Sequence, residues 1–268
     1  MMQVQQTLGI IRVRNKTAYF EQDTLISEHA LQISINDEVI IHLSCTPKNL
    51  EELVIGHLFS QGFIHHHRDI ELLQINEDLS ASVRLRNFNS LLHRPSSQQA
   101  LQNAAIQSAS PHNIENALTE DAKIALPVEA MFSYEEILER AASLQNRSVL
   151  FQKTGGVHAC ELYCTAQKSY YMEDIGRHNA FDKTLGAALR DGVPFANAML
   201  LTTGRVPNDI LFKAIVAKLP ILVSRSAPTA EAVGLAREHN ITLCGFARDR
   251  RMNIYSVPER IYGITYIS

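Results

Sequence analysis

Cysteines and long apolar runs are scarce in this chain, and neither sign of charge is in large excess. The four cysteines among 268 residues are too few for the disulfide framework of a small secreted protein. No stretch approaches the roughly 18 apolar residues of a membrane span, and the N-terminus lacks a signal-peptide pattern. The formal net charge is only −3, which argues against a global field that attracts nucleic acid or an anionic membrane. We therefore expect a cytoplasmic protein that binds neither.

The chain divides by composition into three parts. Residues 91–118 are rich in Ser, Gln, Asn and His and show no sustained apolar period, so we predict a mobile linker there. The linker separates an N-terminal domain, residues 1–90, from a C-terminal domain, residues 119–268. Both parts are long enough to bury a hydrophobic core without disulfides or structural metal.

The N-terminal domain has the pattern of a small α+β unit. Apolar and β-branched runs predict two antiparallel hairpins, over residues 30–45 and 71–86. Between them, Thr46 is expected to cap a helix with Pro47 at its first position, and the helix is expected to stop at Gly62.

The C-terminal domain alternates between strand-like and helix-like segments. Ser133 and Glu136 form a capping box that predicts a helix through about Leu144. Strands are then expected at residues 149–153, 168–174, 198–202 and 220–224, with two closing strands near 242–247 and 252–256. Such alternation predicts an α/β domain with a mostly parallel sheet and helices on both faces.

Glycines, hydroxyl groups and arginines gather at the expected strand-to-helix junctions. In an open α/β sheet, ligands bind outside the carboxyl ends of the strands, where helix N-termini present unpaired N–H groups. The junctions are Thr154-Gly155-Gly156, residues 173–178 with Arg177, Thr202-Thr203-Gly204-Arg205, and Ser224-Arg225-Ser226. Together they predict an anion-binding rim.

A further cluster of arginines follows the first closing strand. Phe246-Ala247-Arg248-Asp249-Arg250-Arg251 holds three arginines and one acid. Arginines suit pyrophosphate, Phe246 or an arginine plane can stack on a ring, and Asp249 can accept from a guanine-like N–H edge. The alternative is that these arginines are solvated turn residues. The predicted cofactor-binding residues are Gly155, Gly156, Arg177, Arg205, Phe246, Ala247, Arg248, Asp249, Arg250 and Arg251.

Several stretches resemble the formate dehydrogenase accessory sulfurtransferase family. They are GHLFSQGFI at 56–64, TGGVH at 154–158, EDIGRHNAFDK at 173–183, Thr-Gly-Arg at 203–205, SRSAPT at 224–229, and GF…NIY…PERI between 245 and 261. The resemblance implies a C-terminal domain with the cytidine deaminase fold but without its zinc site. It also implies that Phe246 to Arg251 bind bis(molybdopterin guanine dinucleotide).

The same resemblance implies a function and partners. Members of the family carry sulfur from a cysteine desulfurase to the molybdenum or tungsten cofactor before the cofactor enters the formate dehydrogenase catalytic subunit. The sulfur travels as a persulfide on a C-x-x-C motif between the two domains. A homodimer is also expected, since proteins of this kind and size are commonly twofold dimers.

The sequence departs from the family at the sulfur-carrying motif. Where C-x-x-C is expected, residues 107–112 read QSASPH, and no cysteine occurs between Cys45 and Cys160. A serine hydroxyl cannot form a persulfide, because that chemistry needs a thiolate. The sequence therefore assigns no catalytic residue.

Cys160 and Cys164 leave three alternatives open. The two lie four residues apart on what we expect to be a helix, so their thiols would share one face, and the helix N-terminus could lower the pKa of Cys160. They could be buried core residues, a relocated sulfur relay, or zinc ligands together with His158 and His178.

We therefore expect an accessory protein of formate dehydrogenase that binds the guanine-dinucleotide cofactor and, by resemblance, transfers sulfur to it. The alternative is a cofactor carrier or chaperone that has lost sulfur transfer. A nucleotide-acting enzyme on the deaminase-like scaffold is disfavoured, because the sequence lacks the zinc-binding and catalytic residues of a deaminase.

Overall fold

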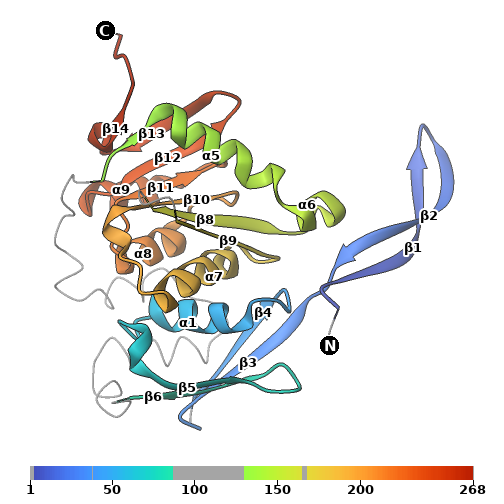
Figure 1. Cartoon of the computed structure of the whole chain (residues 1–268). Coiled ribbons are helices and arrows are strands. Elements are labelled where there is room, and N and C mark those ends of the chain that lie inside the picture. Colours follow the sequence, from blue (N-terminus) through green and yellow to red (C-terminus); the bar gives the residue numbers. More distant parts are fainter. Residues whose placement is uncertain (1–2, 38, 87–129, 165–167, 268) are drawn as a thin grey trace.

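A six-stranded sheet forms the centre of the computed structural model, which describes residues 3–37, 39–86, 130–164 and 168–267. The strand order is β13-β12-β11-β10-β8-β9 (Figure 1). The strands are β8 (His158–Cys164), β9 (Ser169–Asp174), β10 (Ala198–Thr202), β11 (Ile221–Ser224), β12 (Thr242–Arg248) and β13 (Arg251–Ser256). The predicted linker, residues 91–118, lies outside the described residues.

Helices cover both faces of this sheet, which confirms the predicted α/β class. On one side lie α5 (Tyr134–Asn146) and α6 (Val149–Thr154), and on the other α7 (Arg177–Arg190), α8 (Asn208–Val216) and α9 (Ala230–Glu238) (Figure 1). Strand side chains alternate between the two cores: Cys160 and Leu162 pack towards α7, and Ala159 and Tyr163 towards α5. Short 3₁₀ turns occur at His67–Asp69, Phe195–Asn197 and Pro258–Arg260.

The prediction of a mostly parallel sheet is wrong for half of the strands. β10, β11 and β12 are parallel, whereas β8, β9 and β13 run antiparallel to their neighbours. Residues 149–153, predicted as a strand, form helix α6 instead. Ser148 caps this helix by accepting the Phe151 N–H at 3.0 Å, and Gly155 ends it in the left-handed region at φ 64°. The strand therefore follows the glycine turn and carries Cys160 and Cys164, which were expected on a helix.

The N-terminal part contains the predicted α+β elements. Its sheet has the order β4-β3-β6-β5, with β3 (His29–Ile35), β4 (Val39–Cys45), β5 (Ile70–Ile75) and β6 (Ala81–Leu85). Both predicted hairpins are confirmed as antiparallel pairs. Helix α1 (Leu50–Ser60) begins after Asn49, so the prediction of Thr46 as its cap is wrong. The Thr46 hydroxyl instead accepts the Ile175 N–H at 3.0 Å.

Helices α1 and α7 join the two parts at a close crossing. A β-carbon on Gly56 would lie 1.8 Å from the Asp182 carbonyl oxygen, and one on Gly186 would lie 2.0 Å from the Glu52 carbonyl oxygen. The two backbones are therefore in direct contact, and only glycine fits at both positions. One buried cluster runs through this crossing from Leu31 in β3 to Leu243 in β12.

A buried ion pair fixes the loop that precedes α7. The Lys183 ammonium donates to Asp174 Oδ2 at 2.6 Å and to the Thr46 carbonyl at 3.1 Å. The same carboxylate accepts the N–H groups of Thr46 and Gly176 and the amide of Asn179. The motif EDIGRHNAFDK thus supplies both charges of a pair that ties α7 to the N-terminal part.

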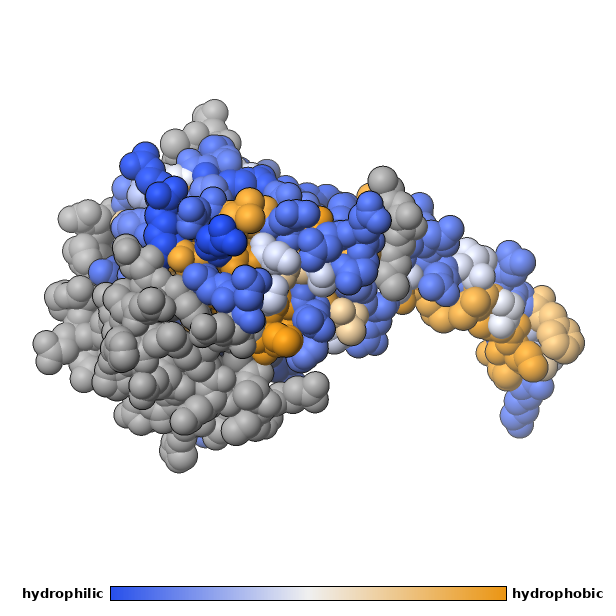
Figure 2. Space-filling view, turned by 90° about the horizontal axis from the view of Figure 1, so that it is seen from below, coloured by the Kyte–Doolittle hydropathy of each residue, from blue (hydrophilic) through white to orange (hydrophobic). Residues whose placement is uncertain are grey.

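A two-stranded arm projects from the molecule, formed by β1 (Gln5–Arg14) and β2 (Thr17–Ile26) (Figure 1). Ile11, Val13 and Phe20 lie on one face of the arm and are 61%, 64% and 92% exposed. Figure 2 shows apolar atoms gathered along one side of it. Two short strands, β7 (Phe132–Ser133) and β14 (Ile261–Tyr262), pair in parallel near the C-terminus. Among the described residues, no helix has the length and apolar character needed to cross a membrane.

Candidate functional site

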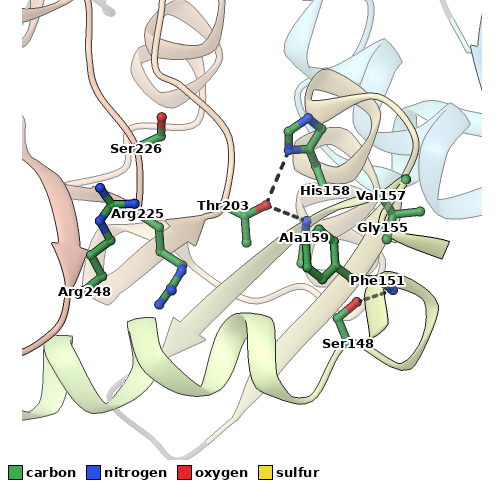
Figure 3. A pocket seen from close by; sticks show the side chains of 11 residues that line it. Ser148, Phe151, Gly155, Val157, His158, Ala159, Thr203, Arg225, Ser226 and Arg248 are labelled. Atoms are coloured by element: carbon green, nitrogen blue, oxygen red, sulfur yellow. Dashed lines mark hydrogen bonds between the residues drawn. The ribbon is translucent and has the colours of Figure 1, made fainter. Parts of the chain in front are cut away.

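A pocket of about 440 Å³ lies at the edge of the central sheet, at the carboxyl ends of β10, β11 and β12. Because β8 is antiparallel to β10, the start of β8 reaches the same edge. We call this the sheet-edge pocket; it is lined by Ser148, Phe151, Gly155, Gly156, Val157, His158, Ala159, Thr203, Arg225, Ser226 and Arg248 (Figure 3).

Thr203 holds the middle of the pocket together. Its hydroxyl accepts the Ala159 N–H at 3.0 Å and lies 3.5 Å from His158 Nδ1 (Figure 3). Burial lowers the pKa of His158, and the positive charges of Arg177 and His178 lower it further. At neutral pH the His158 imidazole is therefore uncharged and offers one donor and one acceptor.

Two arginines lie on the opposite side of the pocket from the Gly155-to-His158 loop (Figure 3). Arg225 donates from Nη1 to the Ala141 carbonyl at 2.7 Å, and burial lowers the pKa of its guanidinium. Arg248 is more open, with 46% of its side chain exposed. The pocket thus combines fixed positive charge with backbone turns and hydroxyls, which suits a phosphate-bearing ligand.

The residues of the predicted stretch from Phe246 to Arg251 lie in different environments. Arg248 lines the sheet-edge pocket, Ala247 is buried, and Asp249, Arg250 and Arg251 are exposed around the turn between β12 and β13. Asp249 and Arg250 both have positive φ, 53° and 61°, as in a type I′ turn. Their role in binding stays a prediction.

Phe246 sits in a strained backbone position beside the pocket. Its φ is 52°, a region that bulky residues rarely adopt, and its N–H donates to the Ser226 carbonyl at 3.0 Å. The register between β12 and β13 shifts between Gly245 and Arg248, so this segment is a β-bulge. The bulge brings the β12 end against the loop that carries Arg225 and Ser226.

Both predicted glycines lie in the pocket, whereas Arg177 and Arg205 do not line it. Gly156 packs closely against the arm, because a β-carbon there would lie 2.9 Å from Ile26 Cγ2 and would require a shift. Arg177 packs against Gly204 beside His158, and its Nε is buried with no hydrogen-bond partner in the described part of the chain. Arg205 is exposed.

Some lining residues were not among the predicted site residues. Arg225, Ser226, Thr203 and His158 stood in the motifs that pointed to this edge, so the signal was present in the sequence. Ser148 and Phe151 were missed, because their segment was predicted as a strand.

All four cysteines are among the described residues, and all four are buried. Burial raises the pKa of Cys45, Cys160 and Cys244 to about 12, and it also raises the pKa of Cys164. The expectation that a helix N-terminus lowers the pKa of Cys160 is therefore wrong, since Cys160 lies in a central strand with its thiol 3.3 Å from the Thr202 hydroxyl. These observations favour buried core residues over a sulfur relay.

Zinc binding by His158, Cys160, Cys164 and His178 is not supported. Across the described ranges, no three His, Cys, Asp or Glu side chains gather as metal ligands would. Cys160 and Cys164 also pack in the hydrophobic core on the α7 side of the sheet.

Comparisons with known proteins agree on one family. A sequence model of the FdhD/NarQ family matches residues 26–262. The chain is 37% identical over 260 residues to "Sulfur carrier protein FdhD" of Halalkalibacterium halodurans, covering 96% of both chains. It is 34% identical over 244 residues to the protein of that name from Bacillus subtilis, covering 90% of this chain and 91% of the other.

A solved structure has the same fold over nearly the whole chain. It comes from Desulfotalea psychrophila, is described as a candidate formate dehydrogenase accessory protein, and is 25% identical with a TM-score of 0.77. The match covers 97% of this chain and all of the other. The chain therefore belongs to the FdhD/NarQ family.

Proposed function

We propose that this chain is an accessory protein of formate dehydrogenase that holds bis(molybdopterin guanine dinucleotide) as its cargo at the sheet-edge pocket. The names of its relatives, sulfur carrier and formate dehydrogenase accessory protein, support the first half of the proposal. The observation that carries the second half is the meeting of Arg225 and Arg248 with the Gly155-Gly156 turn in one pocket.

The residues present fit the nucleotide end of such a cargo. The pocket volume of about 440 Å³ lies in the range of small-molecule sites, so it suits one guanine nucleotide rather than the whole cofactor. Arg225 and Arg248 would neutralise phosphates, and the hydroxyls of Thr203 and Ser226 would donate to their oxygens. Phe246 and the exposed Arg250 and Arg251 flank Arg248 in the chain, and the rest of the cofactor would extend over this segment.

The burial of all four thiols favours a protein that holds the cofactor without transferring sulfur to it. A persulfide forms only on a thiolate, and burial keeps all four thiols of this chain protonated and covered. The chain would then protect the cofactor and deliver it to the formate dehydrogenase catalytic subunit. Transfer of sulfur from a cysteine desulfurase through this chain's own cysteines is the second candidate, supported by the family alone.

Binding is tested with guanosine diphosphate, using Arg248→Ala and Arg225→Ala. Each loses a charge-assisted contact to phosphate, so we expect the Kd measured by calorimetry to rise at least about tenfold. Arg84→Ala is the matched control, because Arg84 is an exposed arginine on β6 in the other sheet. Unchanged affinity in both pocket variants, with intact melting temperatures, would refute this location.

Sulfur transfer is tested by incubating the protein with a cysteine desulfurase and cysteine, followed by intact mass spectrometry. We expect no adduct of about 32 Da, the mass of one sulfur, on the wild type. An adduct that disappears in Cys160→Ala or Cys164→Ala would overturn the carrier assignment and restore the relay.

A further inference from the structure

The side chains of the two-stranded arm point to two unlike faces. Ile11 is paired with Phe20, and Val13 with Ala18, across the two strands. Because alternate residues of a strand share a face, these four side chains lie together with Gly9. All five residues are exposed, and Phe20 is exposed almost completely. We call them the apolar face of the arm.

The arm carries its charges on the other face, where they are paired. Arg12 lies 3.1 Å from Glu21 and 3.2 Å from Asp23, and Arg14 lies 3.5 Å from Glu21. Along both strands, every residue on the same side as the apolar face is uncharged. Charge therefore gives this side no preference for nucleic acid, an anionic membrane or a charged protein. The surface that complements it is neutral and apolar.

The apolar face needs a cover for as long as the chain is folded. A two-stranded sheet without a further layer is at best marginally stable in water. The body of the molecule packs against the base of the arm, where Ile26 meets Gly156, and leaves Phe20 and Ile11 exposed. A second copy of the chain is present whenever the first is, so it can supply this cover at all times.

The apolar face combines a protrusion with a hollow. Phe20 projects from it, whereas a β-carbon on Gly9 would have no neighbour within 4 Å in the described part of the chain. Gly9 lies two residues before Ile11, the partner of Phe20, so the protrusion and the hollow are diagonal neighbours. A twofold interface uses one patch on both copies, and that patch must fit itself. Each Phe20 can fill the hollow at the other copy's Gly9, and this reciprocal fit selects a second copy.

We propose that two copies of this chain associate through the apolar faces of their arms, around a twofold axis between Phe20 and Gly9. The strands are ten residues long, so the face is about 33 Å by about 10 Å, or roughly 330 Å² on each copy. Two copies thus bury on the order of 700 Å², less than the roughly 1,200 Å² of a standard interface. The dimer is therefore reversible and depends on concentration.

The dimer is tested by sedimentation velocity of the full chain between about 1 and 100 μM. The average mass of the wild type should rise with concentration from 30.0 kDa towards twice that value. Phe20→Glu places two like charges in a desolvated interface, so we expect its dimer Kd to rise at least about tenfold. Tyr19→Glu is the matched control, because Tyr19 is the neighbouring aromatic residue on the other face and is also exposed.

A second variant separates lost association from a damaged arm. Gly9→Ile replaces glycine by a residue that favours a strand, so the arm itself should become more stable. The new side chain also fills the hollow that receives Phe20, and the dimer Kd should again rise at least about tenfold. Circular dichroism melting checks that each variant is folded.

Three results would overturn the proposal. A wild type that stays at 30.0 kDa throughout would show that a different protein covers the arm. Equal loss of association in Phe20→Glu and Tyr19→Glu would show that the two faces do not differ. A dimer that survives both Phe20→Glu and Gly9→Ile would place the interface elsewhere.

Discussion

Three buried acids in this molecule lie beside basic side chains. Asp174 pairs with Lys183, Asp182 with Lys213, and the fully buried Glu161 lies 3.2 Å from Arg147 of the neighbouring α5–α6 segment. A buried pair is costly to break, because the remaining charge stays in a low-dielectric interior. Individual carboxylates should therefore control how the protein responds to acid.

The stabilising contribution of the Asp182 carboxylate should be lost as the pH falls below 4. Burial acts to raise its pKa, but the charge of Lys213 and the contact with His57 outweigh this and lower the pKa from 3.8 to about 2. A depressed pKa in the folded state adds stability that is complete above pH 4 and disappears between pH 4 and pH 2, on the order of 2 kcal/mol. Urea denaturation of the wild type and Asp182→Asn between pH 2 and 5 measures it.

The stability difference between these two proteins should shrink as the pH falls through that window. Parallel curves would show that Asp182 does not titrate with a depressed pKa. Asp78→Asn is a useful control, because Asp78 is also an acid with a lowered pKa but is fully exposed, so it should change the curve little.

At the scale of elements, most of the fold was predictable from pattern and the exceptions have local causes. The alternation of apolar segments predicted both N-terminal hairpins, and the capping box at Ser133, which accepts the Glu136 N–H at 3.0 Å, predicted the start of α5 closely. The strand predicted at Val149-Leu150-Phe151 is wrong, because the periodicity of so short an apolar run cannot distinguish a strand from a helix. Ser148 starts the helix as its N-cap, and Gly155 ends it in the left-handed conformation.

That single error hid part of the candidate site. Because residues 149–153 were predicted as a strand, the segment that forms β8 was predicted as a helix. The antiparallel direction of β8, which brings His158 to the pocket, could therefore not be derived. The glycine and arginine junctions were still identified, because their residue types suit ligand binding whatever the strand direction. The pairing of Asp182 with Lys213 was not predictable, since the two residues lie on different helices, 31 positions apart.

Two glycine-to-alanine changes, one at the crossing of α1 and α7 and one in α9, should have opposite effects on stability. Gly186→Ala places a methyl group 2.0 Å from the Glu52 carbonyl oxygen, so we expect a loss of at least about 3 kcal/mol in the free energy of unfolding. Gly234→Ala in α9 has nothing within 4 Å and should stabilise the protein by about 0.5–1 kcal/mol, because alanine favours a helix. Urea denaturation followed by circular dichroism measures both. A mild effect of Gly186→Ala would mean that the helices separate easily.

At the scale of the whole molecule, the N-terminal and C-terminal parts share one hydrophobic core. The cluster that includes Leu31 and Leu53 continues through Phe181 to Leu243, and the Asp174–Lys183 pair also binds Thr46. Separate folding of the two parts would expose the α1–α7 contact and remove the hydrogen bonds between Thr46 and this ion pair. We expect the described parts of the chain to unfold as one unit.

The buried thiols can report this cooperativity. Cys45 lies in the N-terminal sheet and Cys244 in the central sheet, and both are fully buried. In a urea series with brief alkylation pulses and peptide mass spectrometry, both should become reactive at the same midpoint, because each is released by global unfolding. Exposure of Cys45 at clearly lower urea than Cys244 would show that the N-terminal part opens first.

The base of the two-stranded arm lies against Gly156, one of the residues that line the sheet-edge pocket. Its strands are ten residues long, so the tip reaches about 33 Å beyond the base, while Ile26 at the base rests against Gly156. A β-carbon on Gly156 would lie 2.9 Å from Ile26 Cγ2, so the base of the arm packs closely against the loop that lines the pocket. The arm therefore joins an exposed apolar surface around Phe20 to the wall of the sheet-edge pocket in one continuous hairpin.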